Sequence, residues 1–137
     1  MAWDMVDTEI ILRLVLAAIA SGLIGFEREK VHKPAGLRTL MLVGIGAALF
    51  VLVTLRAIPG EVVRIMAGIA TGIGFLGAGA IFKDESHVRG LTTAASIWAV
   101  AAIGITAGLG EYALMAVATI LILFVLELNR IKYFREL

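Results

Sequence analysis

The chain has 137 residues, of which 61% are hydrophobic, with a mean hydropathy of +1.00, no cysteine and a formal net charge of +1. A soluble domain this small would have to expose large apolar patches, so the composition excludes an ordinary soluble protein and predicts that lipid surrounds the chain. The missing cysteine excludes disulfides and thiolate metal sites, and the small net charge provides no basic surface for nucleic acid.

Five apolar segments predict an all-α, polytopic transmembrane bundle of about five helices, folded as one domain over residues 1–137. A spanning helix needs ~20 mostly apolar residues. In chain order, the predicted helices are residues 9–27, 38–56, 64–82, 90–109 and 112–129. The first is expected to be retained, because Met1–Glu9 lacks the basic segment of a cleaved signal peptide. It tolerates Arg13 near its end by snorkelling.

The fifth segment is the shortest, with 15 uncharged residues from Tyr112 to Leu126. It reaches spanning length only when Glu111 and Glu127 are included at its edges. An alternative is that segments four and five form one broken segment. The glycines before Glu111, which include Gly108, favour a tight turn between two helices.

Basic residues are distributed unevenly between the two sides that five helices define. Nine of them fall on one side and three on the other, and the side rich in Lys and Arg is expected to be cytoplasmic. The sequence therefore predicts a multi-pass protein of the inner cell membrane, with its N-terminus outside and its C-terminus in the cytoplasm. The nine are Arg28, Lys30, Lys33, Arg38, Lys83, Arg89, Arg130, Lys132 and Arg135; the three are Arg13, Arg56 and Arg64.

Glycine is concentrated in the third predicted helix, which contains Gly68, Gly72, Gly74, Gly77 and Gly79. Small residues let helix backbones approach closely in membranes, and Gly68 and Gly72 have the spacing of such a contact. The alternative is a thin-walled passage or an unwound stretch beside a site. The glycines also match a dinucleotide-binding pattern, but an uncharged apolar run is the wrong context for that motif.

A polar stripe runs along the fourth predicted helix. Thr92, Ser96 and Thr106 recur on one helical face, and their hydroxyls need partners in lipid. An interhelical seam satisfies that need, and the wall of a polar pathway is the functional alternative.

Charged residues gather where the predicted helices begin and end. Arg13, Arg38, Arg64 and Arg89 lie at or near helix starts, where a cation opposes the helix macrodipole. Contact with lipid headgroups explains this placement as arginine–phosphate binding. The alternative is a cytoplasmic network in which Glu27 and Glu29 pair with Arg38 and Arg89.

Metal and catalytic chemistry have thin support. Asp84 and Glu85 are neighbouring oxygen ligands of the kind that Mg²⁺ prefers, with His87 nearby, although any hydrated loop shows as much. The histidines have no zinc-site spacing and no placed nucleophile, so the chain is not expected to be an enzyme.

The sequence resembles the MgtC/SapB family of bacterial and archaeal membrane proteins. The match runs through Gly22–Glu29 with Ala35–Thr39, Arg64–Gly79, and Val88–Trp98 with Ala102–Gly104. The resemblance implies a role in magnesium homeostasis and a membrane part that many members extend with a soluble C-terminal domain, which is not expected here because the sequence stops at Leu137. The positions of this sequence that correspond to the family's motifs are Glu27, Arg28, Glu29, Arg38, Gly74, Gly77, Gly79, Arg89, Thr92, Thr93 and Trp98.

Two functions follow as hypotheses. The first is an accessory or regulatory protein that docks through glycine-rich faces onto itself or onto another membrane complex. The second is a small transporter or channel for Mg²⁺ or protons, which the absence of Asp and Glu from the apolar runs disfavours. We expect a homodimer or other homo-oligomer with the third helix near its interface, so that Gly72→Leu shifts it to monomer.

Overall fold

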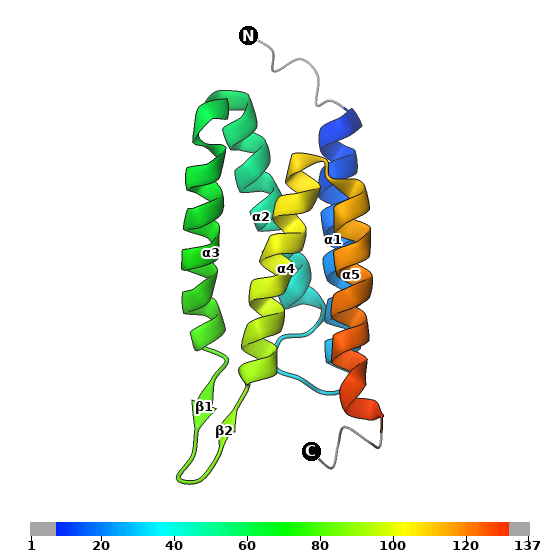
Figure 1. Ribbon diagram of the computed structural model, residues 1–137, viewed down its shortest axis with the longest axis vertical. Coiled ribbons are helices and arrows are strands. Elements are labelled where there is room, and N and C mark those ends of the chain that lie inside the picture. The colour runs from blue at the N-terminus through cyan, green and yellow to red at the C-terminus, as the bar shows by residue number, and fades with distance from the viewer. Residues whose placement is uncertain (1–7, 132–137) are drawn as a thin grey trace.

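The structure is a computed structural model and describes residues 8–131. Five α-helices follow one another with short connections: α1 (Thr8–Lys30), α2 (Leu37–Ala57), α3 (Val62–Ala78), α4 (Leu91–Leu109) and α5 (Tyr112–Glu127). Single turns of 3-10 helix, η1 (Pro59–Glu61) and η2 (Leu128–Arg130), precede α3 and follow α5. The helices run roughly alongside one another, and α1 begins at the end opposite to where α5 ends (Figure 1). The predicted all-α bundle is confirmed.

Among the described residues, four helices are long and apolar enough to cross a membrane. The fifth, α5, has 16 residues and falls below that length. The predicted boundaries differ most at α3, which ends at Ala78 rather than at residue 82. Gly79 caps α3, and Phe82–Lys83 (β1) then pairs antiparallel with Val88–Arg89 (β2) in an exposed hairpin that the sequence did not predict.

The core lies between α1, α2 and α4. Its largest fully buried side chains include Ile24, Leu40, Val51, Val100 and Ile103. Helices α2 and α4 cross closely, and glycines of α4 allow this approach.

The glycines of α4 at that crossing are Gly104 and Gly108, whereas the Cβ position of Gly44 on α2 faces Ser21 of α1. A Cβ atom on Gly104 would lie 2.3 Å from the carbonyl oxygen of Gly44, and one on Gly108 would lie 2.9 Å from the carbonyl oxygen of Ala48. Both obstacles are backbone atoms, which cannot rotate away. Gly108 was interpreted from the sequence as part of a turn, and the four-residue spacing of Gly104 and Gly108, which is typical of a helix contact, was not used.

Helix α3 stands at the edge of the bundle, on the far side from α1 and α5 (Figure 1). Gly77 is its one buried residue, and it packs against α4, where an added Cβ would lie 3.4 Å from the carbonyl oxygen of Ala94. Phe75 and Val63 are 87% and 78% exposed. Most of α3 therefore faces its surroundings rather than the protein.

Candidate functional site

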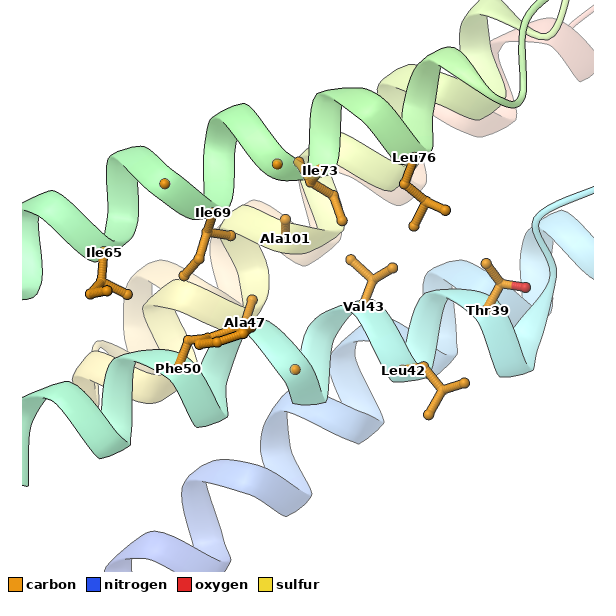
Figure 2. A pocket seen from close by; sticks show the side chains of 13 residues that line it. Thr39, Leu42, Val43, Ala47, Phe50, Ile65, Ile69, Ile73, Leu76 and Ala101 are labelled. Atoms are coloured by element: carbon orange, nitrogen blue, oxygen red, sulfur yellow. The ribbon is translucent and has the colours of Figure 1, made fainter.

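A long apolar groove lies between α2 and α3, with Ala101 of α4 also in its lining; we call it the α2–α3 groove. Its volume is about 700 Å³, and it is lined by Thr39, Leu42, Val43, Gly46, Ala47, Phe50, Ile65, Gly68, Ile69, Gly72, Ile73, Leu76 and Ala101. Figure 2 shows isoleucines of α3 directed toward α2, with Val43 and Ala47 on the opposite wall. The groove is therefore a feature of the lipid-facing surface, without charged side chains in its walls.

The glycines predicted in the third helix have three different surroundings. Gly68 and Gly72 line the groove, and no atom lies within 4 Å of a Cβ placed on either. Gly74 has an equally open environment but lies outside the groove, about 200° around the helix from Gly72. Gly77 contacts α4, and Gly79 ends the helix. Within one chain, the expected Gly68–Gly72 contact is therefore not made.

Glu27 and Arg28 form a buried ion pair at the end of α1. Their side chains are 9% and 5% exposed, and Arg28 donates from Nη2 to Oε1 of Glu27 over 2.7 Å and from Nε to Oε2. A buried charge is stable only with such a partner, so each side chain depends on the other.

Glu29 has a different role, which removes it from the predicted network. Its Oε2 accepts a hydrogen bond of 2.8 Å from the backbone N–H of Leu37, where α2 begins. A carboxylate there complements the helix macrodipole. Within residues 8–131, no carboxylate lies at ion-pair distance from Arg38 or Arg89, both exposed. The predicted pairing of Glu27 and Glu29 with those arginines is therefore not the arrangement that the structure has.

Arg13 joins α1 to the turn between α4 and α5. Its Nε donates to Glu9 over 2.9 Å, and its Nη1 donates over 2.8 Å to the carbonyl oxygen of Gly108, in the last turn of α4. The hydroxyl of Tyr112 donates to the same carboxylate. Arg13 thus places its charge at the C-terminal end of α4, where a cation stabilises the helix dipole. Its position near the start of α1 did not predict this contact.

Two hydroxyls of α4, those of Ser96 and Thr106, are satisfied within their own helix. Ser96 donates to the carbonyl oxygen of Thr92, and Thr106 to that of Ile103, both over 2.7 Å. Thr93 and Ser96 are buried, whereas Thr92 and Trp98 are exposed. These residues therefore do not line a common polar pathway. In the described part of the chain, Ser21 Oγ, which faces Gly44, is the one buried side-chain polar atom without a partner.

The predicted metal ligands lie in the exposed β1–β2 hairpin. Asp84 Oδ1 accepts the backbone N–H of Glu85 over 2.8 Å, as in an ordinary turn. Residues 8–131 contain no group of three or more His, Asp or Glu side chains that could hold a metal ion. Asp84 and Glu85 are therefore not joined by a third such side chain within residues 8–131.

A second, smaller cavity of about 290 Å³ lies between the ends of α1 and α5, and its lining includes Glu27, Lys30, Glu127 and Arg130. Glu127 accepts hydrogen bonds of 3.0 Å from Arg130. These bonds raise the pKa of the Arg130 guanidinium, which keeps its positive charge. The buried Glu27–Arg28 pair therefore lies at the edge of a mixed-charge surface.

Fold and site together define a polytopic helical membrane protein whose charged side chains gather at the ends of its helices. A sequence profile of the MgtC family matches residues 14–132, and the chain belongs to the MgtC family.

Three curated relatives show how far the similarity extends. "Putative magnesium transporter YhiD" of Escherichia coli K12 is 45% identical over 93% of this chain and 63% of its own length. "Protein MgtC" of Salmonella typhimurium LT2 is 48% identical over 82% of this chain and 49% of its own length. "Protein MgtC" of Brucella abortus 2308 is 50% identical over 83% of this chain and 48% of its own length. The chain thus spans about half to less than two thirds of these relatives. No solved structure matches it significantly.

Proposed function

We propose that this magnesium-related membrane protein is an accessory protein, which acts by docking α3 onto a second membrane helix. The observation that carries the proposal is the exposure of α3, where Gly77 alone is buried. Ala70, Gly74 and Ala78 recur every four residues, so they share the face of α3 turned away from the groove. Small residues in this pattern support close helix association in membranes.

The interior of the bundle supports the same proposal. Ion conduction needs a path with polar groups that replace the hydration shell. The buried hydroxyl of Ser96 is bonded to its own helix, and glycines bring the backbones of α2 and α4 into contact. An accessory role requires no such path. The simplest docking partner is a second copy of the chain, which gives a two-fold dimer through α3.

Gly74→Leu tests the docking surface. The new side chain meets open space within one chain, so the fold should remain intact while the close approach of a second helix is blocked. On sizing in mild detergent, we expect Gly74→Leu to shift the protein toward monomer. The sequence led us to expect that Gly72→Leu would give the monomer. Because Gly72 is equally open but lines the groove, we now take Gly72→Leu as the matched control, which should leave the profile unchanged. A shift produced by Gly72→Leu alone would move the contact to the groove.

Magnesium or proton transport is the second candidate, favoured by the buried Glu27–Arg28 pair and by the name of the Escherichia coli relative. Sealed liposomes that contain the full chain, read with magnesium and pH dyes, separate the two functions. The accessory proposal predicts the same leakage as empty liposomes. Magnesium or proton flux that is present in the wild type and lost in Glu27→Gln would contradict the accessory proposal and support transport.

A further inference from the structure

The α2–α3 groove is too short for a spanning helix and too apolar for water. We propose that it holds one acyl chain of a phospholipid, with the lipid phosphate beside Arg38 and Thr39. This site is separate from the docking face of α3, because the groove and Gly74 lie on opposite sides of that helix.

The length of the groove matches one leaflet of a bilayer. Along α2 the lining begins at Thr39 and ends at Phe50, which is about 17 Å at a rise of ~1.5 Å per residue. A bilayer has a hydrocarbon core ~30 Å thick, so each leaflet contributes roughly half of that depth. A spanning helix would need a groove over the whole depth. A single acyl chain needs only the length that the groove has.

The walls favour a hydrocarbon occupant. Gly46, Gly68 and Gly72 have no atom within 4 Å of an added Cβ, so they leave the space open. An unfilled groove of about 700 Å³ would forfeit the dispersion contacts of every wall atom. Water is a poor substitute, because a bound water needs two to four polar partners and Thr39 supplies the one side-chain hydroxyl in the lining.

Charge at the Thr39 end fits a phosphate. Thr39 begins the lining, and Arg38 precedes it at the start of α2, on the side that the charge bias predicts to be cytoplasmic. Arg38 is exposed and has no carboxylate partner in residues 8–131, whereas Glu29 is occupied by the backbone of Leu37. A guanidinium binds phosphate through two parallel hydrogen bonds. An anionic phospholipid therefore satisfies both the groove and its charged end.

Native mass spectrometry of the full chain tests the proposal. The protein is purified in mild detergent, supplied with phosphatidylglycerol, and compared with Gly68→Leu and Gly72→Leu, each of which fills the groove. Gly74→Leu adds the same side chain to the other face and is the matched control. We expect a bound phospholipid in the wild type and in Gly74→Leu, and its loss in both groove variants. Arg38→Gln should weaken binding of phosphatidylglycerol more than that of phosphatidylcholine.

Two results would overturn the proposal. One is equal phospholipid occupancy in Gly72→Leu and Gly74→Leu, with circular dichroism showing both to be folded. The other is that the groove variants lose a bound second copy of the chain rather than a bound lipid. The docking proposal is tested by the oligomeric state of Gly74→Leu, and the lipid proposal is tested by the phospholipid bound to Gly68→Leu and Gly72→Leu. The failure of one proposal can therefore be distinguished from the failure of the other.

Discussion

The bundle of α1, α2 and α4 and the largely exposed helix α3 use glycine in opposite ways. At Gly104 an added Cβ would meet a backbone oxygen at 2.3 Å, whereas at Gly72 it would meet nothing within 4 Å. Both residues lie in apolar helices and belong to pairs spaced four residues apart, with Gly108 and Gly68. Glycine spacing thus marks a helix that can be approached closely, and only the tertiary structure decides whether the neighbour belongs to the same chain.

Breaking an ion pair should give the largest difference in stability loss between the bundle and α3. Arg28→Leu leaves the Glu27 carboxylate buried without a partner and should lower the free energy of unfolding by about 3–5 kcal/mol. Arg64 lies on α3, pairs with Glu61 of η1, and has a side chain that is 83% exposed. Arg64→Leu breaks this pair and should change the free energy of unfolding little. Denaturant titration of both variants in the same detergent measures the difference.

The double variant Glu27→Met with Arg28→Leu is the control for this comparison. Because it removes both charges, it should be more stable than Arg28→Leu alone. If Arg28→Leu proved no less stable than Arg64→Leu, the ion pair would not be buried as described.

A single methyl group should separate the two kinds of glycine. Gly104→Ala forces α2 and α4 apart and should destabilise the protein by about 1–3 kcal/mol. Gly72→Ala meets open space and should be neutral, or stabilising by up to about 1 kcal/mol because alanine favours the helix. Thermal unfolding followed by circular dichroism compares them. Equal melting temperatures would contradict the close crossing of α2 and α4.

Removing the acidic residue near the start of a helix should give the smallest difference in stability loss. Glu29→Ala removes the acceptor for the first N–H of α2 and should lower stability by about 0.5–1 kcal/mol. Glu61→Ala, at the position that precedes α3, should have no measurable effect on capping, because Glu61 makes no side-chain cap bond. Glu29→Gln keeps an acceptor oxygen and should recover part of the loss. A drop as large for Glu61→Ala would mean that both helices depend on their preceding acids.

The sequence predicted the helices because their apolar runs are long and are interrupted by charge or by glycine and proline. It did not predict the β1–β2 hairpin, whose strands have two residues each and depend on the left-handed Gly90. A Cβ on Gly90 would lie 1.9 Å from the carbonyl oxygen of Ala80, so the chain can turn there only without a side chain.

The sequence predicted that Glu27 and Glu29 make interactions at the helix ends, but it did not predict their partners. Glu27 and Glu29 are two residues apart on α1, and they point to different surroundings, one to Arg28 and the other to the start of α2. The distribution of charges along the chain favoured arginines at the starts of other helices. Which carboxylate meets which cation depends on the loop that follows α1, whose path only the tertiary structure shows.

The bond from Arg13 to Gly108 has a consequence for the order in which the chain is made. The two residues are 95 positions apart. At a synthesis rate of about 5–20 residues per second, α1 waits roughly 5–20 s before the end of α4 exists. During that interval Glu9 is the nearby counter-charge, and a cation inside a membrane helix is costly. The bond from Arg13 to Gly108 can therefore form only after α4 has been made, so this contact between α1 and α4 is a late step in folding.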